Sequence, residues 1–286
     1  MNNKQRTTNN KQRTYKAFTL IELVVAVALL AIVFLFAGTI FKVSINAYRT
    51  SVANAEIMQK LRAITDQLNA DFKGVILTVG GKVAFDFENS DIDGQTVSVR
   101  SDCIAVFANG DFQSTRQYPS TSGDKTVVGN VAIIYYGLAD VNTTDPREKI
   151  LVRRQTILTS DTGLTEDFSF GGQTEYYKSS LSELIVDGTF DVNKMMVRRS
   201  LDPTEPNDLV NYMAKGVDDF TIQYVGWEEN PPEIKKFNEW RPENKDVNDW
   251  PKYLSPLAFK FTFTLYDSKG VIKNGRTFTH IVYLGN

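Results

Sequence analysis

The sequence predicts an α+β protein. A long amino-terminal α-helix, with a membrane-spanning half and an amphipathic half, should pack on a head domain built mostly of antiparallel β-sheet. Three patterns support this. Residues 17–41 are almost continuously apolar, apolar residues then recur at spacings of three and four as far as Phe72, and period-two runs follow from Val75 onward.

The amino-terminal residues predict a polar leader followed by a membrane helix. Residues 1–16 hold only basic charges, at Lys4, Arg6, Lys11, Arg13 and Lys16, and lack the apolar surface needed to fold. In residues 17–41 the only charge is Glu22, and at about 1.5 Å per residue the run exceeds a hydrocarbon core about 30 Å thick. It is too long for the apolar part of a cleaved secretory signal. The positive-inside rule leaves the leader in the cytoplasm and sends residues after Lys42 outward.

The helical pattern continues beyond the membrane. One apolar stripe is formed by Ile45, Tyr48, Val52, Ile57, Leu61, Ile64, Leu68 and Phe72. No proline interrupts residues 18–73, and Gly74 is the expected helix stop. We expect the stripe to pack on the chain's own head domain.

The remaining sequence reads as short strands. Runs at 83–87, 96–100 and 104–108 alternate, and in residues 257–265 the apolar side chains face one way while Lys260, Thr262 and Thr264 face the other. Residues 130–136 should pair with 150–157, and residues 257–266 with 276–284, as antiparallel hairpins. A short helix is expected from Asp208 to Lys215, ended by Gly216.

Composition excludes several chemistries. With one His and one Cys the chain cannot form a Cys/His zinc cage, a CxxC redox pair, an HExxH site or an intramolecular disulfide. A net charge of -2 argues against nucleic-acid binding. Nucleotide-binding glycine loops and the GxSxG nucleophile motif are absent from the sequence. Paired carboxylates for glycoside hydrolysis stay open, because Asp and Glu occur throughout the head, but nothing singles out a pair. Our leading expectation is a protein that is not an enzyme, with no catalytic residues and no cofactor.

The junction between leader and apolar helix is the most informative motif. Lys16 and Ala17 are followed by FTLIEL, which places Glu22 at the fifth position after Ala17. This junction resembles the class III signal of type IV pilins and type II secretion pseudopilins. The resemblance implies that a prepilin peptidase cuts between Ala17 and Phe18 and methylates the new amine of Phe18. The family prefers Gly where this chain has Ala17.

Glu22 has two interpretations. A carboxylate in hydrocarbon is costly and usually faces a partner. Cleavage before Phe18 would create a positive amine about 6 Å along the helix axis from Glu22, so the Glu of one subunit could neutralise the terminus of a neighbour during assembly, as the resemblance implies. The alternative is a Glu22 that reaches the lipid headgroups from near the helix end.

The resemblance extends to particular minor subunits. Residues 61–75, the paired runs near 130–157, residues 216–227 and the late strand look like the J-type pseudopilin and the PilW-type minor pilin. It implies a leader of residues 1–17 that is removed, a transmembrane and fibre-core helix at 18–43, an amphipathic half at 44–74 and an extracytoplasmic head at 75–286. The implied partners are prepilin peptidase, other pilins or pseudopilins, an inner-membrane assembly platform and the lipid bilayer.

Other possible sites are weaker. Asn89, Asp91 and Asp93 have the spacing that opens an EF-hand loop, but Arg100 stands where its bidentate Glu belongs, so a plain Asp-Gly turn is preferred. His280 is expected to be a packed or edge histidine. Cys103 is expected to be a small buried thiol.

Residues 226–256 contain all three tryptophans, Trp227, Trp240 and Trp250, with Arg241 beside the second. Aromatic and Arg side chains are common anchors of protein interfaces, so this segment is a possible partner-binding loop. The alternative is that the Trp rings cover the open end of the sheet.

These observations leave three functions open. The first is a structural subunit of a type II secretion pseudopilus or a type IV pilus, with a head large enough to favour a tip or initiation complex. The second is a tip adhesin or substrate-binding subunit that uses the Trp-rich segment. The third is a membrane-anchored enzyme, for which the leader would stay uncut and Glu22 would be dispensable.

Overall fold

The computed structural model describes residues 19–79, 82–83, 85–88, 101–139, 143–166, 174–180, 184, 208, 210–229, 232–234 and 256–284. Of these, residues 78–88 and 226–234 are described by their backbone alone. The chain divides into two compact units, residues 1–51 and 52–286, and each is considered by itself.

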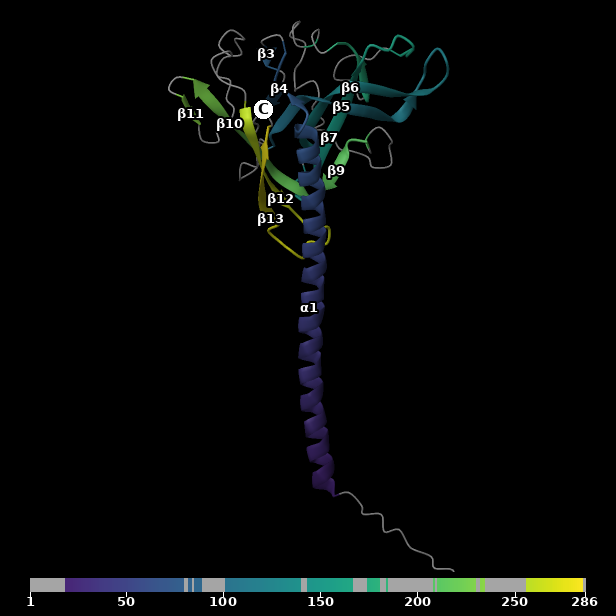
Figure 1. Ribbon diagram of the computed structural model, residues 1–286. Coiled ribbons are helices and arrows are strands. Elements are labelled where there is room, and N and C mark those ends of the chain that lie inside the picture. Colours follow the sequence, from purple (N-terminus) through teal and green to yellow (C-terminus); the bar gives the residue numbers. More distant parts are fainter. Residues whose placement is uncertain are drawn as a thin grey trace, which may run out of the picture. The chain divides into compact units, whose positions relative to one another are not determined.

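One helix, α1, runs from Leu20 to Phe72 over 53 residues (Figure 1). In the first unit its large apolar side chains are exposed, including Leu23, Phe34 and Ile40. The most apolar window of α1 has a mean hydropathy of 3.0 with none of its residues buried, so by length and composition the helix could cross a membrane. The helix prediction is confirmed.

In the second unit the helix buries a narrow stripe. Ala53, Ile57, Ile64, Leu68 and Phe72 are all buried, at helical spacing. The predicted stripe is right from Ile57 onward but began too early. Ile45 and Tyr48 are 50% and 71% exposed, because helical periodicity alone does not say where along a helix its packing partner begins.

Gly74 follows the helix end as expected, but for a different reason. Its φ is not among the positive values of the described glycines, so it is no left-handed cap. A Cβ at Gly74 would lie 2.2 Å from the carbonyl oxygen of Asn109. The Asn109 amide also donates a hydrogen bond to the Gly74 carbonyl at 2.7 Å. Gly74 therefore allows the chain leaving α1 to run directly beside a strand.

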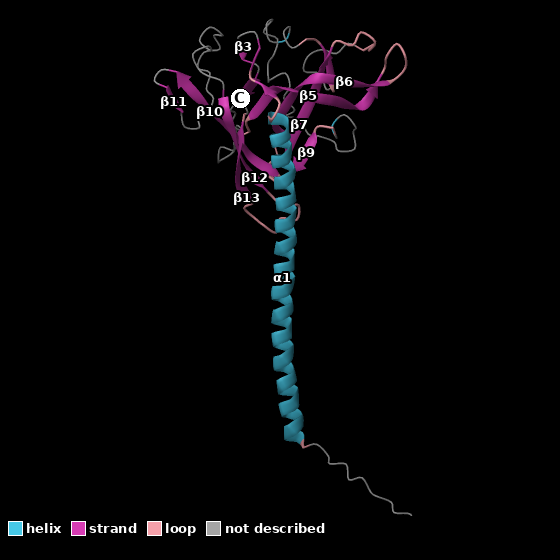
Figure 2. Ribbon diagram, in the orientation of Figure 1, coloured by secondary structure: helices cyan, strands magenta, loops and turns pink. Residues whose placement is uncertain are grey.

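Two larger sheets form the head (Figure 2). The seven-stranded sheet has the order β1-β5-β6-β7-β8, with β4 also paired to β5 and β9 to β7. Its strands are β1 (Val75–Ile76), β4 (Phe85–Glu88), β5 (Cys103–Tyr118), β6 (Lys125–Ala139), β7 (Ile150–Thr159), β8 (Tyr176–Lys178) and β9 (Tyr212–Lys215). All of its pairings are antiparallel except β7 with β8.

The second sheet has four strands in the order β11-β10-β12-β13, all antiparallel. They are β10 (Val217–Glu229), β11 (Pro232–Ile234), β12 (Pro256–Leu265) and β13 (Arg276–Tyr283). A small ladder joins β2 (Thr78–Val79) and β3 (Lys82–Val83). The α+β layout of helix and mostly antiparallel head is thus as predicted.

Both predicted hairpins form. Residues of β6 pair with β7 from Val131 opposite Leu158 to Ala139 opposite Ile150. In the terminal hairpin, β12 pairs with β13 with Phe261 opposite His280. The predicted strand at 96–100 lies outside the described residues.

The helix predicted from Asp208 to Lys215 is wrong over its second half, although Asp208 itself is helical. Residues 212–215 form β9, whose backbone pairs with Ile150, Leu151 and Val152 of β7. Helix propensity over so few residues is weak against a ready-made sheet edge. Gly216, expected to end that helix, has a φ of 78° and turns the chain between β9 and β10.

The main core joins the second half of α1 to both sheets. It contains Ile57, Ile64, Leu68 and Phe72 of the helix with buried residues of β5, β6, β10 and β12. The Phe72 ring lies 5.6 Å from Phe259, 5.3 Å from Phe261 and 6.3 Å from Tyr136 between ring centroids. Phe259, Phe261, Phe263 and Leu265 are fully buried, as the period-two pattern predicted. Thr264, predicted to face solvent, is buried as well, where its hydroxyl pairs with that of Thr277 on β13 at 2.9 Å.

A second cluster covers the opposite face of the seven-stranded sheet. Cys103 is 3% exposed there, which agrees with the expected buried thiol. The middle strands β5 and β6 are therefore buried on both faces, and both are almost continuously apolar where they cross the core, at residues 103–108 and 131–139.

Candidate functional site: the start of α1 and its seating in the head

The first turn of α1 is closed by a reciprocal pair of side chains, Thr19 and Glu22. The Thr19 backbone amide donates to Glu22 Oε2 at 2.8 Å, and the Thr19 hydroxyl donates to the same oxygen at 2.9 Å. In return, the Glu22 amide donates to Thr19 Oγ1 at 3.4 Å. This is a capping box, in which the residue before the helix and the third helical residue satisfy each other's free amides.

The capping box explains why a carboxylate is tolerated at this place in an apolar helix. The first amides of a helix lack partners within the helix, and negative charge is favoured at that end. Glu22 supplies the negative charge, and Thr19 fixes the position of its carboxylate by two hydrogen bonds. Sequence reasoning singled out Glu22 but missed Thr19, although a Thr three residues before a Glu at the start of an apolar run is a helix-start signature.

The far end of α1 is fixed by a buried polar cluster that the sequence analysis also missed. Asp71 is 6% exposed and receives two hydrogen bonds from Arg153 of β7, Nε to Oδ2 at 2.6 Å and Nη2 to Oδ1 at 2.7 Å. Tyr136 of β6 donates its hydroxyl to Asp71 Oδ2, and Gln67 donates to Oδ1 at 2.9 Å. The carboxylate is thus fully engaged.

This cluster joins helix to sheet with a charge pair that water hardly reaches. Burial raises the pKa of the Tyr136 hydroxyl well above its ordinary value, and the neighbouring Asp71 carboxylate raises it further. Burial alone would lower the pKa of Arg153, but hydrogen bonds to Asp71 outweigh it and raise that pKa. A signal for Asp71 was present, since it stands seven residues after Ile64 and three after Leu68, on the apolar face.

A third contact seats α1 near the point where its stripe begins. Glu56 accepts hydrogen bonds from the Ser268 amide at 2.9 Å and the Ser268 hydroxyl at 3.0 Å. Lys60 pairs with Glu56 at 2.9 Å and donates to the Tyr266 carbonyl at 2.8 Å. Partial burial raises the pKa of the Glu56 carboxyl, but the bonds from Lys60 and Ser268 prevail and hold that pKa below its ordinary value.

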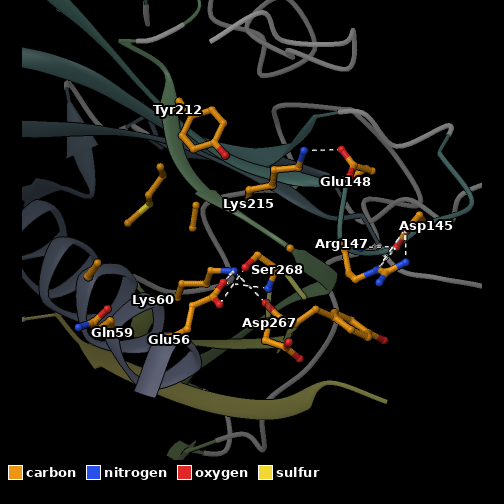
Figure 3. Close-up of a pocket in the computed structure, with 15 residues that line it drawn as sticks. Glu56, Gln59, Lys60, Asp145, Arg147, Glu148, Tyr212, Lys215, Asp267 and Ser268 are labelled. Atoms are coloured by element: carbon orange, nitrogen blue, oxygen red, sulfur yellow. Dashed lines mark hydrogen bonds and ion pairs between the residues drawn. The ribbon is translucent and has the colours of Figure 1, made fainter. Parts of the chain in front are cut away.

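Beside this contact lies a pocket of about 740 Å³ (Figure 3). Its walls include Gln59 of α1, Tyr212 and Lys215 of β9, and the loop residues Asp145, Arg147 and Glu148. The charges are paired within it, Arg147 with Asp145 at 2.7 Å and Lys215 with Glu148. Among the described residues no group of His, Cys, Asp and Glu could hold a metal ion. Asp267 also lines the pocket, and its carboxylate accepts hydrogen bonds from the Val271 and Ile272 amides.

The remaining predicted residues fall in different places. Ala17 and Phe18 lie outside the described residues, as do Asn89, Asp91, Asp93, Trp240, Arg241 and Trp250. Trp227 is described by its backbone, which pairs in β10 opposite Ile234 of β11. The start of the Trp-rich segment is therefore a β-hairpin and not a loop. His280 is half-buried on β13, with Nε2 2.9 Å from Asn69 Oδ1 of α1, which agrees with a packed edge histidine.

Comparison with known proteins bears on the amino-terminal part of the chain. Residues 12–38 match the prokaryotic N-terminal methylation motif. No curated protein and no solved structure matches the chain. The matched residues run from the leader across the Ala17–Phe18 junction and through the first turns of α1, and they include both Thr19 and Glu22.

The chain thus carries an amino terminus of the prepilin type, followed by an apolar helix suited to membrane anchoring. The motif supports a subunit of the pilin or pseudopilin type, processed by a prepilin peptidase and assembled with other pilins. Subunits of this type are structural and are not typically enzymes.

Proposed function

We propose that the chain is a minor pilin or pseudopilin, a structural subunit of a type II secretion pseudopilus or a type IV pilus. The observation that carries this proposal is the methylation motif at residues 12–38, continuous with an apolar helix whose side chains are exposed in the first unit. Such a surface needs either lipid or the helices of other subunits around it.

In this proposal the peptidase cuts between Ala17 and Phe18 and removes residues 1–17. Residues 18–43 lie first in the inner membrane and later in the fibre core, residues 44–74 form the amphipathic half, and residues 75–286 form the extracytoplasmic head. The partners are prepilin peptidase, other pilins or pseudopilins bound through the helix, and the inner-membrane assembly platform. The Glu22 carboxylate neutralises the methylated amine of a neighbouring subunit.

A J-type or PilW-type role at the fibre tip is the finer form of the proposal. Its support is the size of the head, whose described residues form two larger sheets and three buried clusters in addition to the helix. A head of this bulk would crowd a closely packed shaft. The tip adhesin, with Trp227, Trp240, Arg241 and Trp250 as its binding surface, is the alternative role for the same fibre position.

The test is incorporation into the fibre. Full-length protein with a label in the head should appear in sheared fibres and be concentrated at one end. Replacement of Glu22 by Ala should leave the subunit in the membrane fraction. Even labelling along the filament would contradict the tip role, whereas normal incorporation of the Glu22→Ala variant would contradict the assembly role of Glu22.

A further inference from the structure

The hydrogen bonds of the capping box use the Glu22 carboxylate unequally. Both donors of Thr19, its amide and its hydroxyl, bind Oε2. Within the described part of the chain Oε1 accepts no hydrogen bond, and Glu22 is exposed on the helix surface. Thr19 therefore fixes one oxygen at the helix start and leaves the other free to accept a bond from outside.

This arrangement suits an acceptor that must bind a cation within an apolar environment. A charge-assisted hydrogen bond is about twice as strong as a neutral one, and its benefit depends on both groups being held in position before they meet. A Glu side chain that is free to rotate loses conformational entropy when a partner orders it. Thr19 has already ordered Glu22 before a partner arrives.

We propose that Thr19 is a positioning residue for assembly, which orients Glu22 so that Oε1 receives the terminal amine of a neighbouring subunit. This inference rests on the proposed function, because the neighbour's amine arises only after processing at Phe18. The capping box need not break on assembly, since the amine and Thr19 bind different oxygens of the same carboxylate.

The competing explanation is that Thr19 only caps the helix. The two roles separate when Glu22 is replaced by Gln, because Gln at this position also completes a capping box but carries no charge. If Thr19 acts as a cap alone, removing its hydroxyl lowers fibre incorporation by the same factor whether residue 22 is Gln or Glu. If Thr19 positions the charge of Glu22, removing the hydroxyl does not lower incorporation any further in a variant that already has Gln at position 22.

The experiment uses the full chain with its own assembly system and compares Thr19→Val, which keeps the shape and removes the hydroxyl, with Thr19→Ser, which keeps a hydroxyl. Thr39→Val is the matched control, because the Thr39 hydroxyl bonds only to the Leu35 carbonyl of its own helix at 3.0 Å. Fibre incorporation is measured by mass spectrometry as a ratio to co-expressed wild type and divided by the pool with a methylated Phe18, so that a processing defect is not counted.

We expect Thr19→Val to lower incorporation about tenfold, the size of one hydrogen bond to a charged group, while Thr19→Ser and Thr39→Val stay close to wild type. The double variant Thr19→Val/Glu22→Gln should incorporate no less than Glu22→Gln alone. The inference is overturned if Thr19→Val behaves like Thr39→Val, or if Thr19→Val does equal harm in both backgrounds. If wild type is unprocessed, or Glu22→Gln assembles normally, the proposed function itself is at fault.

Discussion

Asp71 shows how a single charged residue can fix the seat of a long helix. It lies on the apolar face of α1, where an unpaired carboxylate would be costly to bury. Bonds from Arg153, Tyr136 and Gln67 compensate for that cost. The two-pronged bond to Arg153 adds a directional requirement to the hydrophobic contacts, because both of its hydrogen bonds form together at only one position of the helix.

Replacement of Asp71 by Ala should therefore destabilise the head strongly. The change leaves the largely buried Arg153 guanidinium without its carboxylate, and removing one partner of a buried pair costs about 3 kcal/mol or more. Urea unfolding of the detergent-solubilised protein measures the loss. Asp66→Ala, which removes an exposed carboxylate of the same helix, should change the unfolding free energy little. Equal effects of the two changes would contradict the anchoring role of Asp71.

Glu56 predicts a dependence of stability on pH. Its pKa lies below the ordinary value of 4.5, so its charged form is favoured in the folded protein. The stabilisation should be fully present at neutral pH and disappear as the pH falls below about 4.5 through the folded pKa. The difference in unfolding free energy between wild type and Glu56→Gln should shrink over the same range. A difference that stays constant down to the lowest pH would show that Glu56 does not act through its charge.

At the scale of elements, the junction between α1 and the sheet depends on Gly74. A Cβ there would meet the Asn109 carbonyl oxygen at 2.2 Å, and backbone atoms cannot move aside as a flexible side chain would. Gly74→Ala should thus cost about 1–3 kcal/mol, the usual range for forcing extra atoms into a packed site. Gly38→Ala, within α1, is the matched change, since a Cβ at Gly38 meets nothing within 4 Å. The head should unfold at the same urea concentration with Gly38→Ala as in wild type.

Much of this fold follows from local pattern. Period two along residues 257–265 predicted the burial of Phe259, Phe261, Phe263 and Leu265 but not that of Thr264, and helical spacing predicted the buried stripe from Ile57 to Phe72. Two features did not follow from local pattern: the strand β9 and the residue at which the buried stripe of α1 begins. The strand β9 exists because β7 offers an unpaired edge, which is a property of the sheet and not of residues 212–215. The early limit of the stripe depends on where the sheets begin to cover α1.

The functional residues also divide into those that the sequence predicted and those that it did not. Glu22 was predicted because a charge in an apolar run stands out. Asp71 and Glu56 were not. The place of Asp71 on the apolar face was an overlooked signal, whereas Glu56 is half-buried and looks in sequence like the other charged residues of the helix. Their role arises from contacts with Arg153 and Ser268, which lie far along the sequence.

For the whole molecule, the apolar half of α1 sets the central requirement. Its large side chains are exposed in the first unit, and an apolar surface of this extent requires lipid or other helices around it. Membrane anchoring alone would satisfy that requirement, and so would a fibre core. Only the fibre requires that the leader be removed, because the proposed partner of Glu22 is the amine that cleavage exposes.

The most direct measurement is the intact mass, with amino-terminal sequencing, of the protein extracted from membranes and from fibres of its native cells. The account predicts a chain that lacks residues 1–17 and begins at Phe18 with one added methyl group. A mature protein in both fractions that retains residues 1–17 would contradict the fibre role and leave the helix as a membrane tether.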